Sequence, residues 1–336
     1  MRPDHTLPRG RVERLTVDCP SLRGNPLDDP WRRAVDVYVP AGHSGAGLPL
    51  LVHLAAYTSS GLAATSWRSF EENLPERLDR LIAEGTLRPC VVACPDAFTR
   101  LGGNQYIDSA VMGLWETALA TEILPAVETA AGCGGPGRRG LFGKSSGGYG
   151  ALVNAMRRPE VWAAAACHAG DMGFEHCYLP EMPATLRALA KHDFSVASFM
   201  AAFEAAARPR RNDVGVLMVL GMAVSYDPDP AAPFGVRLPV DLQTCVLDEV
   251  RWANWRAWDP LEMAPQRLDA LASLKALWID CGRDDEYNLL FGARRLHRLL
   301  KGAGITHTFE EFEGSHGGID HRLDLSLPRL VDALAA

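Results

Sequence analysis

One pentapeptide of this sequence has the spacing with which enzymes present a nucleophilic serine. Residues 143–147 read Gly-Lys-Ser-Ser-Gly, directly after the strand-like run 140–142 and before a stretch of helical composition. A sharp turn from strand to helix strains the serine backbone, and the flanking glycines let neighbouring segments approach closely. We therefore expect the Ser145 hydroxyl to lie above a sheet, beside a helix N-terminus whose dipole favours negative charge.

A serine hydroxyl becomes a nucleophile when a base removes its proton and an acid orients that base. The C-terminal third of the chain supplies both groups, because Asp285 lies in the acidic turn after a predicted strand and His316 lies in the glycine-flanked loop after the next. Their order along the chain is Ser, acid, His, as in enzymes with a G-x-S-x-G turn of the hydrolase type. We predict Ser145 as nucleophile, His316 as base and Asp285 as acid, with Asp284 as the alternative acid.

Two alternative interpretations compete with this prediction. Gly143-Lys144-Ser145 resembles the end of a phosphate-binding loop, but that motif needs glycine where Arg138 stands. Among the other histidines, His168 closes a predicted strand and could line the pocket. Neither feature displaces the prediction of a serine nucleophile.

Composition narrows the classes of function. The net charge is −7 and the basic residues are dispersed, which gives no electrostatic footprint for nucleic acid. The eight cysteines are scattered without metal-ligand spacing, so we expect free thiols and no metal or cofactor. The N-terminus has no apolar stretch typical of a signal peptide, and no segment reaches membrane-spanning length, so we expect a cytoplasmic protein without a membrane partner.

The elements that must position these residues alternate along the chain. Helical composition at 70–84, 110–130, 147–157, 287–301 and 320–334 separates most of the apolar strand-like runs. This alternation predicts an α/β fold with a mostly parallel central sheet and helices on both faces. The predicted strands are 34–39, 48–56, 89–95, 139–142, 161–168, 274–281 and 306–312.

The alternation stops beyond Gly170. Residues 171–265 are rich in Met, Pro, Trp and Ala, and resume no strand-helix rhythm. We predict one domain over 1–336 with a cap-like insertion at 171–265 that covers the site. Ligands bind beyond the carboxyl ends of parallel strands, where this insertion begins.

Beyond the catalytic residues, four side chains are predicted to contact the substrate. Asn104, Gln105 and Tyr106 follow an earlier predicted strand, and Met172 begins the insertion with apolar bulk suited to an acyl or aryl group. The alternative for each apolar side chain of the insertion is packing in the core.

Several segments together resemble the esterase D and enterochelin-esterase-like family, which includes feruloyl esterases and mycolyltransferases. The resemblance extends over nearly the whole chain and implies an α/β-hydrolase fold with a Ser-His-Asp triad. The matching segments are the nucleophile turn at 143–150, a helix at 121–128 similar to the E-L-I-P helix of the family, the acid turn at 282–285 and the G-x-H loop at 314–316.

One segment departs from that family. Its members commonly carry His-Gly after the strand that here runs into Ala55 and Ala56. The Ser146 backbone amide is one expected donor to the oxyanion, and the second would come from about Tyr57, by position alone.

These residues predict a serine carboxylesterase that hydrolyses a small-molecule carboxylic ester or thioester through an acyl-enzyme. Two alternatives stay open at this point. An acyltransferase would pass the acyl group to another alcohol or thiol, and a binding protein would keep the scaffold without activity.

Overall fold

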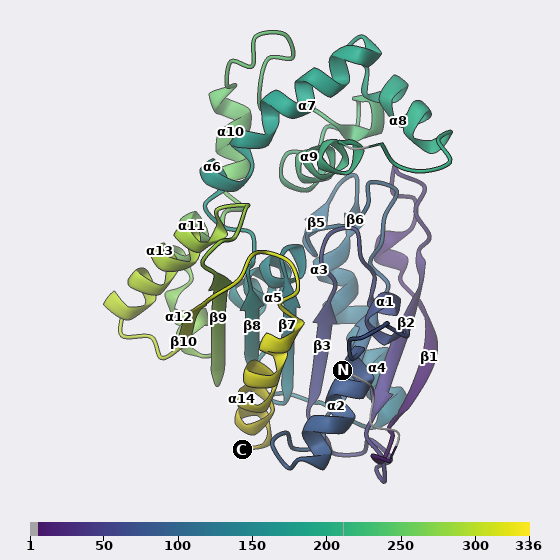
Figure 1. The fold of residues 1–336 in the computed structure, drawn as a ribbon, viewed down its shortest axis with the longest axis vertical. Coiled ribbons are helices and arrows are strands. Elements are labelled where there is room, and N and C mark those ends of the chain that lie inside the picture. The colour runs from purple at the N-terminus through teal and green to yellow at the C-terminus, as the bar shows by residue number, and fades with distance from the viewer. Residues whose placement is uncertain (1–5, 211) are drawn as a thin grey trace.

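An eight-stranded sheet in the order β1-β2-β4-β3-β7-β8-β9-β10 forms the centre of the molecule (Figure 1). The computed structural model describes residues 6–210 and 212–336. β1 pairs with β2 and β2 with β4 in antiparallel fashion, and the other neighbours are parallel, so the prediction of a mostly parallel sheet is confirmed. The strands are β1 (Arg11–Asp18), β2 (Arg32–Val39), β3 (Leu50–Leu54), β4 (Val91–Pro95), β7 (Arg139–Lys144), β8 (Ala164–His168), β9 (Ala276–Gly282) and β10 (Thr308–Phe312).

Three strands have no counterpart among the predicted elements. β1 is the antiparallel edge strand, and a separate hairpin is formed by β5 (Asp108–Ser109) and β6 (Gly113–Leu114). In β1 only Val17 is buried, so the strand lacks the apolar face on which a sequence prediction depends.

Helices cover both faces of the sheet. α2 (Leu74–Ala83) and α14 (Leu323–Ala335) pack on one face, in front of the sheet in Figure 1. The opposite face carries α3 (Trp115–Ala118), the π-helical turn η2 (Leu119–Ile123), α4 (Leu124–Ala131), α5 (Ser146–Arg157), α12 (Leu268–Ala272) and α13 (Leu289–Gly302). The short elements are α1 (Gly61–Thr65), η1 (Pro20–Leu22) and η7 (Asp320–Arg322).

The predicted insertion at 171–265, here called the cap segment, lies between β8 and β9. Figure 1 shows α7, α8, α9 and α10 grouped beyond one end of the sheet, reached from the carboxyl end of β8. α9 is buried along most of its length, as expected for a helix packed on several sides. The helices of the cap segment are α6 (Phe174–Cys177), η3 (Leu179–Glu181), α7 (Met182–Leu189), η4 (Ala190–His192), α8 (Val196–Glu204), α9 (Asp213–Tyr226), η5 (Pro233–Gly235), α10 (Glu249–Arg256) and α11 (Pro260–Met263), followed by η6 (Ala264–Gln266).

Candidate active site

Ser145 occupies the turn between β7 and α5. Its φ of 56° and ψ of −126° lie outside the regions that non-glycine residues ordinarily adopt. The Ser145 amide donates to the His168 carbonyl at 3.0 Å, and the Tyr149 amide donates to the Ser145 carbonyl at 2.8 Å. Backbone strain of this kind is concentrated at functional sites. Here it accompanies a serine that lines a cavity.

The two glycines of the pentapeptide are required by close backbone packing. A β-carbon at Gly143 would lie 2.5 Å from the Leu54 carbonyl oxygen, and one at Gly147 would overlap that same oxygen. The turn therefore rests directly on the carboxyl end of β3. The contact fixes the height of Ser145 above the sheet.

Replacing Gly147 by alanine is expected to lower the free energy of unfolding by about 3 kcal/mol, because the backbone at Leu54 cannot yield as a flexible side chain would. Urea unfolding followed by circular dichroism measures the loss. The matched control is Gly302→Ala in the last turn of α13, where an added β-carbon meets no atom within 4 Å. Equal stability of the two variants would contradict this account of the turn.

The predicted base and acid are hydrogen-bonded to each other. His316 Nδ1 lies 2.8 Å from Asp285 Oδ2, and the Asp285 side chain is fully buried. The other carboxylate oxygen of Asp285 accepts from the amides of Tyr287 at 3.0 Å and Leu289 at 3.3 Å. The His316 amide donates to Glu286 Oε2 at 2.9 Å. These contacts fix the ring orientation and leave Nε2 for a reacting group.

Asp284, the alternative acid, lies elsewhere in the same turn. Its side chain is exposed, while its amide donates to the Gly314 carbonyl at 3.0 Å. The amide contact ties the turn after β9 to the loop that carries His316. Between the two adjacent carboxylates, Asp285 is the one that contacts the base.

Ser145 and His316 line the same cavity, together with Ser146 and Tyr57. No hydrogen bond joins the Ser145 hydroxyl to the His316 ring in the described part of the chain. Catalytic hydrogen bonds are often long before substrate binds and tighten in the reacting complex. The arrangement therefore brings the predicted nucleophile and the predicted base to one cavity.

Two backbone amides at this cavity are available to an oxyanion. Ser146 is the first residue of α5, so its amide has no partner within the helix. The amide of Thr58 is occupied by the Gly102 carbonyl at 2.7 Å, whereas the Tyr57 amide donates to no other described residue. The Tyr57 hydroxyl donates to the Leu101 carbonyl at 2.5 Å, which anchors this segment. Ser146 and Tyr57 are the two donors predicted from the sequence, and their role in holding an oxyanion stays a prediction.

None of the four predicted substrate contacts is among the residues that line this cavity. Asn104 donates to the Ala97 carbonyl at 2.6 Å, and the Tyr106 hydroxyl donates to the Ala55 carbonyl at 2.7 Å. Both side chains therefore hold loop backbone. Gln105 Nε2 donates to the Ser146 hydroxyl at 2.9 Å and so supports the nucleophile turn. Met172 is 1% exposed, packed with the core.

The cavity, of about 230 Å³, has several lining residues that sequence reasoning missed. They come from the start of the cap segment, from α9, from the turn after β9 and the start of α13, and from the carboxyl ends of β3 and β7. Asp171 follows the carboxyl end of β8, so the strand-end rule could have singled it out. The lining residues not yet named as part of this site are Ala56, Thr58, Lys144, Asp171, Cys177, Tyr178, Val214, Gly215, Met218, Tyr287 and Leu289.

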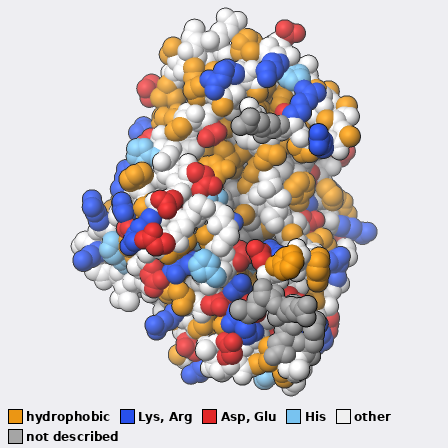
Figure 2. All heavy atoms as spheres, viewed as in Figure 1, with side chains coloured by type: hydrophobic (Ala, Val, Ile, Leu, Met, Phe, Trp, Pro, Cys, Tyr) orange, Lys and Arg blue, Asp and Glu red, His pale blue; other side chains and the backbone are white. Residues whose placement is uncertain are grey.

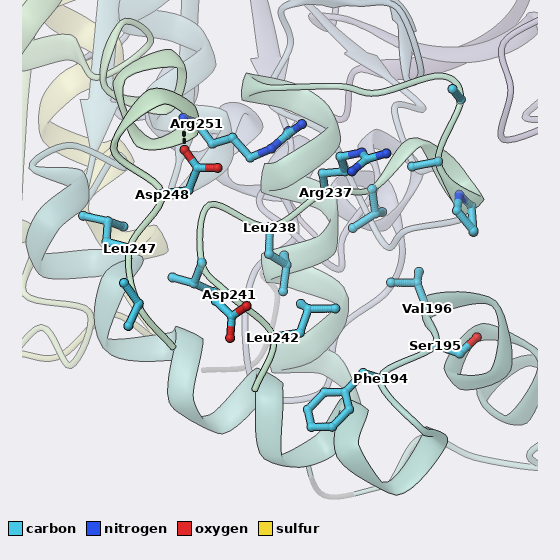
Figure 3. A pocket seen from close by; sticks show the side chains of 16 residues that line it. Phe194, Ser195, Val196, Arg237, Leu238, Asp241, Leu242, Leu247, Asp248 and Arg251 are labelled. Atoms are coloured by element: carbon cyan, nitrogen blue, oxygen red, sulfur yellow. Dashed lines mark hydrogen bonds between the residues drawn. The ribbon is translucent and has the colours of Figure 1, made fainter. Parts of the chain in front are cut away.

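A larger cavity of about 790 Å³ lies within the cap segment (Figure 3). Phe194, Leu238, Leu242 and Leu247 give it apolar walls, and it shares no lining residue with the cavity at Ser145. Ser195, Asp241 and Asp248 line it, but none of the described histidines does, so it holds no serine beside a histidine. Of these two cavities, only the smaller one is lined by both a serine and a histidine.

A second Ser-His-Asp arrangement lies inside the protein. His168 Nδ1 is 2.7 Å from Asp280 Oδ1, and its Nε2 is 2.9 Å from the hydroxyl of Ser326 on α14. The serine is 0% exposed and the histidine 2%, so no substrate can reach them. Asp280 also accepts from Arg322 Nε and Trp278 Nε1, both at 2.9 Å. This is a structural network, and His168 does not line the cavity.

Replacing Asp280 by asparagine is expected to lower the free energy of unfolding by about 3 kcal/mol, because a buried ion pair loses one partner. Burial alone would raise the pKa of Asp280, but His168, Trp278 and Arg322 outweigh burial and hold it below its usual range. The stabilisation is thus present above the unfolded-state pKa of about 3.9 and is lost as the pH falls through the folded-state pKa.

Urea titrations of wild type and Asp280→Asn between neutral and acidic pH measure this dependence. The difference between the two proteins should shrink on acidification. Ser326→Ala, which removes one hydrogen bond from the same network, should cost about 1 kcal/mol. A difference that stayed constant down to the lowest pH would contradict the assignment of Asp280 as an ionised partner.

Two further features bear on cofactors and membranes. Within 6–210 and 212–336, no group of three His, Cys, Asp or Glu side chains is arranged to hold a metal ion. In the same ranges no helix is long and apolar enough to cross a membrane. The eight cysteines are free, and burial raises the pKa of the Cys177 thiol in the cavity wall.

Comparisons with known proteins identify the family and the fold of this chain. The model of a family described as "Putative esterase" matches residues 30–327. Among solved structures, a ferulic acid esterase aligns with a TM-score of 0.60 at 19% identity over 98% of this chain and 99% of its own. An S-formylglutathione hydrolase from Agrobacterium tumefaciens aligns at 0.58 and 16% over 98% of each chain. FphF, a fluorophosphonate-binding serine hydrolase from Staphylococcus aureus, aligns at 0.59 and 14% over 98% and 99%.

No protein of curated function matches the chain. At these identities the solved structures establish the fold, which is that of the α/β-hydrolases, while the family match extends over most of the sequence. The chain therefore belongs to the Putative esterase family and is an ester hydrolase with the α/β-hydrolase fold.

Proposed function

We propose that this esterase hydrolyses a small carboxylic ester or thioester through an acyl-enzyme formed on Ser145. The observation that carries the proposal is the 2.8 Å contact between His316 Nδ1 and the buried Asp285, at a cavity that Ser145 also lines. The cavity volume of about 230 Å³ is below the usual range for drug-sized ligands, which favours a small group beside the scissile bond.

In this mechanism His316 removes the proton from Ser145 as its oxygen attacks the ester carbonyl. The oxyanion accepts hydrogen bonds from the amides of Ser146 and Tyr57. His316 then gives its proton to the departing alcohol or thiol, and the acyl group stays on the serine. A water molecule, deprotonated by the same imidazole, attacks the acyl-enzyme and releases the acid. Asp285 holds the imidazole in the required tautomer throughout.

The test is labelling of the purified full-length protein with a fluorophosphonate probe, followed by peptide mass spectrometry. Such probes trap activated serines, so the peptide that contains Ser145 should carry the label and the Ser145→Ala protein should carry none. Ser326→Ala should label as the wild type does. No label, or a label on a different serine, would reject the mechanism and favour a binding protein without activity.

Acyl transfer to a second alcohol or thiol is the alternative that one observation favours. Val214, Met218 and Leu289 give the cavity apolar walls, which disfavour water near the acyl-enzyme. Product analysis in the presence of increasing methanol separates the two reactions. Release of free acid as the main product at low methanol supports hydrolysis, whereas product that forms only with the added acceptor supports transfer.

A further inference from the structure

Asp171 presents one unsatisfied carboxylate oxygen to the catalytic cavity. The residue follows β8, is 6% exposed and lines the cavity with Ser145 and His316. Its Oδ2 accepts from the Tyr178 hydroxyl at 2.8 Å and from Gln105 Nε2 at 3.2 Å. Its Oδ1 accepts no hydrogen bond from any residue in 6–210 or 212–336. This oxygen is also absent from the fully buried polar atoms that lack a partner, so part of its surface is accessible.

The charge of this carboxylate is not balanced by a close cation. No Lys, Arg or His nitrogen of the described chain forms an ion pair with Asp171, and burial raises its pKa. His316 lies near enough to act on it electrostatically, but that ring is already paired with Asp285. Burying a carboxylate without a cation is costly, so a cationic ligand that reached Oδ1 would relieve that cost.

The surroundings of the cavity favour a cation. Burial and the nearby carboxylates, with Glu181 and Glu286 foremost, raise the pKa of Tyr287 in the cavity wall. On the face of the molecule seen in Figure 2, by contrast, acidic and basic side chains are interspersed. Tyr178 and Tyr287 both line the cavity, and aromatic faces also attract cations. Lys144 is a cation that also lines this cavity, but it acts electrostatically on Asp320 of the neighbouring cavity and forms no ion pair with Asp171 among the described residues.

The position of Asp171 also bears on the reaction. Its Oδ2 is 3.5 Å from the hydroxyl of Ser146, the residue whose amide is proposed to hold the oxyanion. A carboxylate this close to the oxyanion site repels the negative charge that develops there. A cation held between the two would offset that repulsion, and the benefit would be largest in the transition state.

We propose that Asp171 is a specificity residue that binds an ammonium group of the substrate through Oδ1. The preferred ester would thus carry its cation in the acyl part or the alcohol part that enters the cavity. This inference rests on the proposed function, because it assigns a substrate class to the same site.

The test compares esters that differ only in the terminal group. The 4-nitrophenyl esters of 6-aminohexanoate, 6-hydroxyhexanoate and heptanoate place an ammonium, a hydroxyl or a methyl group at one acyl position. Acetylthiocholine and 3,3-dimethylbutyl thioacetate form a cationic and neutral pair on the thiol side. In wild type the cationic member of at least one set should have the higher kcat/KM, by about tenfold or more.

Asp171→Asn keeps the shape of the side chain and removes its charge. This variant should lower the ratio of cationic to neutral kcat/KM by about tenfold or more. The matched control is Asp284→Asn, which removes an exposed carboxylate in the turn after β9 and should leave the ratio within about twofold. Because each ratio comes from one protein preparation, partial misfolding does not change it.

A measurement on wild type alone guards against a variant that fails to fold. Butylammonium should inhibit hydrolysis of 4-nitrophenyl acetate more strongly than 1-butanol does. Equal inhibition, equal kcat/KM within both ester sets, or a ratio unchanged in Asp171→Asn would overturn the proposal. So would a hydroxyl ester as good as the ammonium ester. Wild type that hydrolyses none of the esters and resists fluorophosphonate would instead reject the proposed function itself.

Discussion

The Ser145→Ala protein should hydrolyse 4-nitrophenyl acetate at least about 10⁴-fold more slowly in kcat than wild type, because the substitution removes the hydroxyl that is proposed to form the acyl-enzyme. The strained turn at Ser145 and the cavity that it lines single out this hydroxyl. Residual turnover above the buffer rate would come from the amides of Ser146 and Tyr57, which polarise the carbonyl without a nucleophile. Initial rates of nitrophenolate release measure the loss.

Ser326→Ala is the control for this prediction. Ser326 also lies beside a histidine paired with an aspartate, but it is completely buried. Its removal should leave the rate within about threefold, provided that the protein remains folded at the assay temperature. Purified Ser145→Ala with the activity of wild type would exclude Ser145 as the nucleophile, whatever the result at Ser326.

The Asp285→Asn substitution should lower kcat about 10³- to 10⁴-fold while the fold persists. An asparagine amide can donate to His316 Nδ1, which places the ring proton on Nε2 and prevents that nitrogen from accepting the serine proton. The carboxylate of Asp285 instead accepts from Nδ1 at 2.8 Å. Rates measured across the pH range, with thermal unfolding recorded in parallel, separate this chemical effect from loss of structure.

Asp284→Asn provides the comparison for that substitution. It makes the same chemical change one residue earlier, on a side chain that is exposed and does not contact the base. We expect a change in kcat of less than about threefold. If Asp284→Asn were the more damaging of the two, the base would be oriented by a different carboxylate from the one in contact with it.

Most of the sheet could be predicted because its central strands are buried on both faces and read as continuous apolar runs. The edge strand β1 could not, since it carries Arg11, Glu13 and Arg14 and has almost no apolar face. β5 and β6 are two residues each, too short for any periodicity. A sequence pattern records burial, so elements that bury little leave little trace in it.

The proposed reactive residues leave a clearer pattern in the sequence than the residues around them do. Ser145 and His316 lie in glycine-flanked loops after strands, and this local pattern is visible in the sequence. The choice between Asp284 and Asp285 depends on how one turn directs adjacent side chains, which local sequence does not determine. Asn104 and Tyr106 have polar groups suited to a ligand, but these groups hydrogen-bond loop carbonyls whose positions depend on distant packing.

The role proposed for Asp171 could not be predicted from the sequence either. Strand order places it at the carboxyl end of β8, yet its depth and its unsatisfied oxygen depend on Tyr178 and Gln105, which come from different parts of the chain. The second donor to the oxyanion was likewise hard to predict, because Ala55 and Ala56 replace the His-Gly that is common in the family. Tyr57 as the second donor stays a prediction.

Because α9 contributes to the cavity, some residues that would contact the substrate are encoded apart from the proposed catalytic residues. The proposed nucleophile, acid and base follow strands of the sheet, whereas Val214, Gly215 and Met218 belong to one helix of the cap segment. An added β-carbon at Gly215 would meet no atom within 4 Å. Mutational libraries confined to these three codons could therefore reshape which esters are accepted while the acyl-transfer machinery is inherited intact.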